Sequence, residues 1–199
     1  MIKTYEMLKK ELSGYSDIDN KIARLVKAGE LIRINKGIYE TNKDTPGFLL
    51  AGSIYGPSYL SFDYALYFYG LINEPVEIYT SATYEKKKIK KFTNHFGQYV
   101  YRDIPVYAYM FFRKTYVYED YEFEIATPEK ALCDKLYSLP PVANKKELIK
   151  LLFSDLKINE KRFNELNHEA LEYICGLYKS KNLNLLKKIL KETNNKESE

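Results

Sequence analysis

The apolar residues at the start of the chain recur at the spacing of two helices. Residues 3–12 are rich in helix-forming residues and place their large apolar side chains on one stripe. A second helix is expected to begin after Ser16 or Asp17, which can cap it, and to end at Gly29. Its apolar face follows the i, i+4, i+7, i+8 spacing of an amphipathic helix at Ile18, Ile22, Leu25 and Val26.

Two β-rich runs come next, residues 31–34 and 38–41, on either side of a glycine-containing turn, and they predict a hairpin. Arg33 and Lys36 lie near the tip of this hairpin. The polar face of the second helix carries four residues that can contact nucleic acid: Asn20, Lys21, Arg24 and Lys27.

Helix, basic helix and hairpin in this order predict a winged helix-turn-helix that binds DNA. A helix fits the major groove of DNA, and basic side chains on a hairpin can reach the adjacent phosphate backbone or the minor groove. The alternative is that these charges only solvate an exposed helix face. Residues 1–41 carry eight bases against six acids, which weakens the DNA-binding interpretation.

After a turn-forming segment at 42–47, strands are expected at 76–80, 97–101, 106–112 and 121–125. A helix from Ser61 to Tyr69 is apolar on almost every side, so it is expected to be buried or to lie in an interface. Another helix should begin at Thr127-Pro128 and end before Pro140. Further helices are expected at 145–156, 160–166, 169–179 and 183–192, with a frayed end at 193–199.

These elements predict a mixed α/β (α+β) fold with two domains. The first, residues 1–45, would be a winged-helix DNA-binding domain. The second, residues 46–199, would be a larger α/β domain with a small mixed sheet and a helical C-terminus.

Composition narrows the functional classes. Hydrophobic residues make up 45% of the 199 and charged residues 29%, which is ordinary for a globular protein. No apolar run is long enough to span a membrane, and the start does not read as a secretory leader, so a cytoplasmic location is expected. Two cysteines, Cys133 and Cys175, are too few for a disulfide scaffold or a zinc site built mainly on thiolates. No metal or cofactor is expected.

The net charge of +4 conceals separate basic and acidic segments. Residues 84–102 carry six bases against one acid, whereas residues 115–129 carry five acids and no base. Five of the bases form one run: Lys86, Lys87, Lys88, Lys90 and Lys91. This run is expected to be either a solvated loop or a further contact with DNA phosphate, or with a partner or its nucleic-acid substrate.

Catalytic patterns are weak. His95 and His168 lie in no metal-ligand or nucleophile motif, and no phosphate-binding glycine loop is present. A metal-dependent nuclease or nucleotide-modifying enzyme remains the alternative, with a set of acids and lysines as its candidate site: Glu122, Glu124, Glu129, Asp134, Lys130 and Lys135. Against it, Glu122 and Glu124 alternate along a strand, and Glu129 suits the first turn of a helix in any case. We do not expect an enzyme.

Three stretches, taken together, resemble the AbiEi antitoxins of type IV toxin–antitoxin (AbiE abortive-infection) systems. They are residues 25–39, LVKAGELIRINKGIY; residues 59–71, YLSFDYALYFYGL, followed by YTSAT at 79–83; and residues 125–134, IATPEKALCD. The first looks like the recognition helix and wing of the family. The chain departs from many members in having only about 16 residues before that helix.

The resemblance implies a phage-defence antitoxin with two activities. Its N-terminal domain would bind inverted operator repeats in double-stranded DNA and repress its own operon. Its C-terminal domain would oppose a nucleotidyltransferase-like toxin, for which a stable complex is not required. Antitoxicity would then belong to the domain after residue 46, whose helices at 61–69 and from Thr127 offer a shaped surface.

Overall fold

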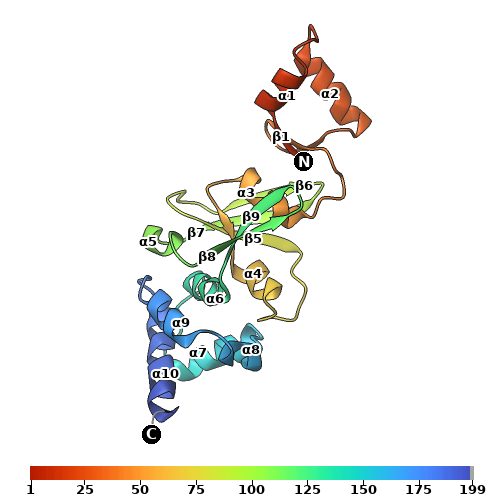
Figure 1. Ribbon diagram of the computed structural model, residues 1–199. Coiled ribbons are helices and arrows are strands. Elements are labelled where there is room, and N and C mark those ends of the chain that lie inside the picture. Colours follow the sequence, from red (N-terminus) through yellow and green to blue (C-terminus); the bar gives the residue numbers. More distant parts are fainter. Residues whose placement is uncertain (198–199) are drawn as a thin grey trace.

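The computed structural model describes residues 1–197, with side chains up to residue 192. The protein has a mixed α/β fold with two β-sheets. A small N-terminal unit lies at one end, a larger sheet occupies the middle and a group of helices forms the other end (Figure 1). Within the described residues, no helix has the length and apolar character needed to cross a bilayer.

The N-terminal unit has the element order strand, helix, helix, strand, strand. These elements are β1 (Ile2–Thr4), α1 (Tyr5–Glu11), α2 (Ile18–Ala28), β2 (Ile32–Asn35) and β3 (Ile38–Glu40). The strands form an antiparallel sheet in the order β1-β3-β2. Leu8, Ile22, Leu31 and Tyr39 form a small buried core between helices and sheet.

The predicted end of the second helix and the predicted hairpin are confirmed. The second helix ends where expected, because Gly29 adopts φ +76°. The hairpin also forms as predicted. The first helix was predicted to begin at residue 3, which is wrong: residues 2–4 pair with β3, and Thr4 caps α1 by accepting a hydrogen bond from the Met7 amide.

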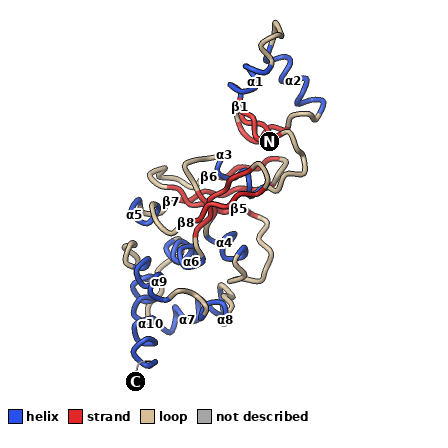
Figure 2. The backbone as a smooth tube through the Cα atoms, viewed as in Figure 1, coloured by secondary structure: helices blue, strands red, loops and turns tan. Residues whose placement is uncertain are grey.

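The central sheet has six strands in the order β6-β7-β5-β4-β9-β8. Their bounds are β4 (Tyr59–Leu60), β5 (Ile78–Thr83), β6 (Lys90–Asn94), β7 (Gly97–Asp103), β8 (Arg113–Tyr118) and β9 (Tyr121–Ala126). The β5–β7 and β4–β9 pairs are parallel and the other neighbours are antiparallel, so the sheet is mixed. Figure 2 shows it as the red layer in the middle of the chain.

The predicted strand at 106–112 is wrong. Pro105 precedes a short helical turn, α5 (Val106–Tyr109), closed by a hydrogen bond from the Tyr109 amide to the Pro105 carbonyl. This turn buries Ala108 and Tyr109 in the core, and the strand starts only at Arg113. Proline lacks a backbone N–H and has φ fixed at about −65°, so Pro105 suits the start of a helical turn better than a paired strand.

Helices cover both faces of the sheet (Figure 1). A 3-10 turn at Gly47–Leu50 leads into α3 (Ala51–Ile54) on the face toward the N-terminal unit. On the opposite face lie α4 (Phe62–Phe68) and α6 (Pro128–Tyr137). As predicted, the Thr127 side chain caps α6 by accepting from the Lys130 amide.

The remaining helices form the C-terminal end: α7 (Lys145–Lys150), α8 (Glu160–Asn164), α9 (His168–Cys175) and α10 (Lys181–Glu197). The segment predicted as one helix, 145–156, changes to a π-helical turn at Leu151–Asp155. The backbone of α10 continues to Glu197, five residues beyond the predicted helix end at residue 192, and residues 198–199 of the segment predicted to fray lie outside the described part.

The hairpin of the N-terminal unit is attached to the central sheet. Ile34 is buried in the larger core, and the Asn35 side chain donates to the Ile54 carbonyl at 2.8 Å. In return, the Asn94 side chain on β6 donates to the Ile34 carbonyl at 3.0 Å. These bonds hold the hairpin next to α3 and to the edge strand β6.

Candidate nucleic-acid interface

One stripe of α2 points away from the protein. Asn20, Arg24 and Lys27 are exposed, and at about 100° per residue they lie within roughly 40° of the direction opposite the buried Ile22. Asp17 fixes the start of this helix, because its carboxylate accepts from the Asn20 amide at 3.0 Å and from the Asn20 side chain. The same hydrogen bonds lower the pKa of Asp17.

Lys21 is set apart from that stripe. Its ammonium lies 4.9 Å from the centre of the Tyr15 ring, and the residue is half-buried. A cation over an aromatic face is held in place but keeps part of its charge available. The structure therefore places Lys21 at the side of α2, beside the turn that joins it to α1.

A hollow of about 420 Å³ separates α2 from the hairpin. Arg33 lines it from β2, with its guanidinium 5.7 Å from the Tyr39 ring and donating to the Tyr39 hydroxyl at 3.4 Å. From the other side, Tyr5 donates its hydroxyl hydrogen to Asp19 at 3.0 Å, and this bond raises the pKa of Tyr5. Arg33 and α2 thus border the same hollow.

Lys36 is exposed in the turn of the hairpin, where Gly37 adopts φ +72°. Its amide donates to the Asn35 side chain at 2.8 Å, and Asn35 in turn donates to Ile54 at the end of α3. The turn is therefore fixed against the central sheet, and Lys36 is presented from a rigid support.

The predicted basic run is divided between a loop and a strand. Lys86, Lys87 and Lys88 lie in the loop after β5, whereas Lys90 and Lys91 begin the edge strand β6. Lys86 lies 5.3 Å from the Tyr55 ring and donates to the Gly56 carbonyl at 3.2 Å. The expectation of a single loop over 85–91 is wrong, because Lys90 pairs with Tyr101 and Lys91 with Val100 on β7.

The basic tip of the hairpin and the basic loop after β5 both contact residues at the end of α3. Asn35, next to Lys36, bonds to Ile54, and Lys86 lies over the neighbouring Tyr55. The basic hairpin tip and the basic loop therefore flank the same turn of chain.

The acidic residues considered for a nuclease site do not lie together in one site. Glu124 pairs with Arg113 at 2.9 Å, and Glu129 accepts from the Asn167 amide at 3.0 Å. Glu122 is exposed on β9. Within the described residues, no group of three or more His, Cys, Asp or Glu side chains is placed to hold a metal ion.

Lys130 and Asp134 instead form the centre of a fully buried polar cluster. The Lys130 ammonium lies 2.5 Å from one Asp134 oxygen, which also accepts from the Tyr178 hydroxyl at 2.5 Å. The other oxygen accepts from Ser61 at 2.7 Å and from Tyr59 at 3.1 Å. The i, i+4 spacing of opposite charges on α6 could have indicated this pair, but nothing in the sequence indicates Tyr178.

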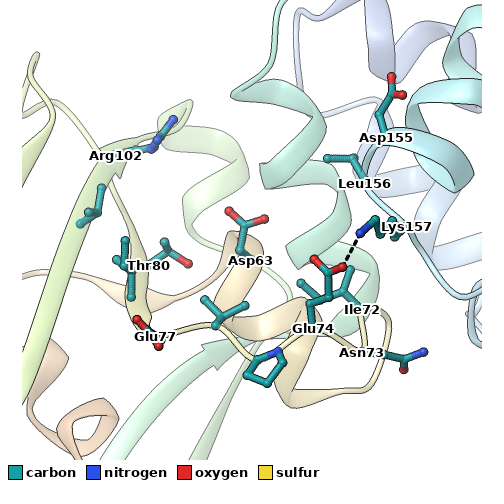
Figure 3. Close-up of a pocket in the computed structure, with 14 residues that line it drawn as sticks. Asp63, Ile72, Asn73, Glu74, Glu77, Thr80, Arg102, Asp155, Leu156 and Lys157 are labelled. Atoms are coloured by element: carbon teal, nitrogen blue, oxygen red, sulfur yellow. Dashed lines mark hydrogen bonds and ion pairs between the residues drawn. The ribbon is translucent and has the colours of Figure 1, made fainter.

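Sequence reasoning also missed a cleft with a volume of about 830 Å³ (Figure 3). It lies between α4, the loop into β5, β7 and the chain around residue 156. Its rim carries an ion pair between Glu74 and Lys157, and Asp63 is held by Lys135 at 2.6 Å. Four segments distant in sequence build the cleft, so no local pattern could reveal it.

Comparisons of the sequence with known protein families and with curated proteins give no match.

Proposed function

We propose that the protein binds double-stranded DNA through its N-terminal unit, acting as a winged helix. In this proposal α2 enters the major groove and the β2–β3 hairpin is the wing. The observation that carries it is the outward stripe of Asn20, Arg24 and Lys27 on a helix whose neighbouring hairpin presents Arg33 and Lys36. Amide and guanidinium groups on an exposed helix suit base edges, while lysines suit phosphate.

The fixed hairpin supports this proposal. Lys36 is carried on a turn bonded to α3, and Arg33 is held against the Tyr39 ring. Side chains on rigid elements lose less conformational freedom when they bind, so more of the interaction energy appears as affinity. Strand β1 pairs with β3 and adds a third strand that supports the hairpin.

The biological role that we propose follows the resemblance to the AbiEi antitoxins. The protein would be a cytoplasmic antitoxin that represses its own operon at inverted repeats and opposes a nucleotidyltransferase-like toxin. The larger unit would carry the antitoxin activity. Its helix α4 buries Phe62 and Leu66 but leaves Tyr67 and Phe68 exposed, which gives that unit an aromatic surface.

The test is a gel-shift titration with DNA from upstream of the protein's own gene. Changing Arg24, Lys27 and Lys36 together to Ala should weaken binding by about a hundred-fold or more, since each removes a contact worth about 1 kcal/mol or more. A matched control changes three exposed lysines of the C-terminal helices, Lys146, Lys150 and Lys188, and should bind like the wild type.

Two results would count against the proposal. Unchanged affinity of the first variant would show that the interface is misplaced. Equal loss in both variants would show that only net charge matters. The antitoxin role is tested separately, by asking whether the neighbouring gene encodes a nucleotidyltransferase-like protein and whether the present protein rescues growth of cells that express it.

A further inference from the structure

Asn20, the third residue of α2, is held by two hydrogen bonds to the residue that precedes the helix. One oxygen of the Asp17 carboxylate accepts from the Asn20 backbone amide at 3.0 Å, and the other accepts from the Asn20 side-chain amide at 2.5 Å. Capping of a helix requires only the first of these bonds. The second bond holds the side chain of Asn20, which is an exposed residue, in one orientation.

The bond to Asp17 determines which polar atoms of the Asn20 side chain remain available. A carboxamide has two N–H donors and one accepting oxygen. One donor is bonded to Asp17, and within the described residues no hydrogen bond engages the other donor or the oxygen. The side chain therefore offers one donor and one acceptor on the outward stripe of α2.

A donor next to an acceptor matches one base in the major groove of DNA. Adenine presents an acceptor, N7, next to a donor, its N6 amino group, and an asparagine amide can bond to both at once. Guanine presents two acceptors, cytosine presents one donor, and thymine presents one acceptor and a methyl group. An amide held in one orientation therefore makes two hydrogen bonds with adenine and fewer with the other bases.

The two acids at the start of α2 are compensated within the protein. Asp17 is bonded to Asn20, and the positive charge of Arg24, two turns further along the helix, helps to lower the pKa of Asp17. Asp19 accepts from the Tyr5 hydroxyl at 3.0 Å and borders the hollow between α2 and the hairpin. These contacts reduce the repulsion that free carboxylates would exert on DNA phosphates.

We propose that Asn20 recognises an adenine in the major groove and that Asp17 is the positioning residue that fixes the orientation of its amide. The inference rests on the proposed DNA binding and deepens it, because it names one base of the bound sequence and the residue that selects it. Its place on the helix agrees with this role, since residues near the N-terminus of a recognition helix contact base edges.

The adenine is found by competition binding of the full-length protein to duplexes from upstream of its gene, with every base pair replaced in turn by each of the other three. At one position the wild type should prefer adenine by about five-fold or more, and Asn20→Ala should lower this preference to about two-fold or less. Lys27→Ala is the matched control on the same stripe. It should weaken binding to every duplex alike and keep the adenine preference.

The positioning role is tested with Asp17→Ser. Serine also caps helices but has a single side-chain oxygen, so it can accept from the backbone amide of Asn20 without also holding the side chain. The helix content measured by circular dichroism should match the wild type, whereas the adenine preference should fall toward that of Asn20→Ala. In the double variant, Asp17→Ser should cause no further fall, because the amide that it positions is gone.

The possible failures are distinguishable. Binding without a position that prefers adenine, or an adenine preference that survives in Asn20→Ala, would overturn recognition by Asn20 and leave the proposed DNA binding intact. A full preference in Asp17→Ser would overturn the positioning role. The absence of binding to any duplex would overturn the proposed function itself, and this inference with it.

Discussion

A buried ion pair, Lys130 with Asp134, is the most consequential single contact in the larger unit. Both side chains are fully buried, so each loses its hydration on folding. Burial lowers the pKa of Lys130, while the Asp134 carboxylate acts in the opposite direction. Hydroxyl donors from Tyr59, Ser61 and Tyr178 satisfy the remaining carboxylate lone pairs, and this makes a buried charge tolerable.

Removing one member of this pair should be far more costly than removing both. We expect Asp134→Ala to lower the free energy of unfolding by about 3–5 kcal/mol, because it leaves a buried ammonium without its counter-charge. The double variant Lys130→Met with Asp134→Leu should lose less than that single variant. Urea unfolding followed by circular dichroism measures all three proteins.

An exposed pair supplies the control for this comparison. Arg162 and Glu165 are close to half-exposed or more, and Arg162→Met should cost only about 0–1 kcal/mol. If the double variant were no more stable than Asp134→Ala, the hydroxyl donors rather than the ion pair would dominate the cluster.

Ser61 shows why a correct sequence prediction can have the wrong physical reason. The sequence predicts a helix capped by Ser61, and α4 does begin directly after it. However, its hydroxyl does not cap the helix and instead donates to Asp134, 73 positions away. The local signal located the boundary, but the tertiary contact that uses the side chain could not be read from neighbouring residues.

At the scale of elements, the start of α2 should respond to pH. Hydrogen bonds from the Asn20 amide and side chain lower the pKa of Asp17 in the folded protein below its value of 3.8. A carboxyl with a lowered folded pKa stabilises the fold above the unfolded value, and this contribution is lost as the pH falls through the folded value.

We therefore expect Asp17→Ala to lower the thermal midpoint of the wild type at neutral pH, and the difference to shrink below about pH 4. Asp17→Asn is the matched control, since asparagine also caps helices but does not titrate. Its advantage over the Ala variant should not fade with pH. A wild-type advantage that persisted at low pH would show that the cap acts by geometry rather than by charge.

Elements with local signals were the ones that the sequence predicted well. Gly29 at the end of α2, the turn at Gly37 and the Thr127-Pro128 start of α6 each act within a few residues. Strands β6 and β8 were missed because they are polar or charged at many positions, and their extended form comes from pairing with β7 and β9. Pairing of this kind depends on register and is not encoded in one segment.

The same distinction applies to the candidate interface. Helical periodicity placed Asn20, Lys21, Arg24 and Lys27 on one polar face, and the structure keeps all but Lys21 on the outward stripe, since Lys21 lies over the Tyr15 ring. Lys86 lies over Tyr55, and the neighbouring Ile54 accepts the hydrogen bond from Asn35 of the hairpin. Neighbouring residues in the sequence could not reveal this arrangement, because it depends on the whole fold. The sequence therefore predicted which residues belong to the candidate interface better than it predicted how they are arranged.

At the scale of the whole molecule, the lysines of the central sheet could extend the DNA-binding surface proposed for the N-terminal unit. Asn35 and Asn94 fix the hairpin to the sheet, so the relative position of the two basic groups is set by direct hydrogen bonds. Like charges gathered along one edge repel one another, and a polyanion would relieve that repulsion. We therefore expect lysines 86–91 to contact the same DNA duplex that is proposed to bind the N-terminal unit.

This leads to a prediction about salt. Each phosphate contact contributes about −0.9 to the slope of log K against log salt concentration. Changing Lys86, Lys87, Lys88, Lys90 and Lys91 to Gln should make that slope shallower by about one or more, while base specificity set by α2 stays the same. Fluorescence anisotropy with upstream DNA and with a scrambled duplex, at several salt concentrations, measures both quantities.

The control must change the net charge equally without touching this edge. Five exposed lysines of the C-terminal end of the chain serve, changed to Gln: Lys146, Lys150, Lys161, Lys179 and Lys188. Because exposed charges more than about 10 Å apart are largely screened at 0.1 M salt, these distant lysines should leave the slope unchanged. Equal flattening in both variants would mean that the whole field of the protein, rather than this edge, attracts DNA. An unchanged slope in the first variant would mean that lysines 86–91 only solvate the sheet.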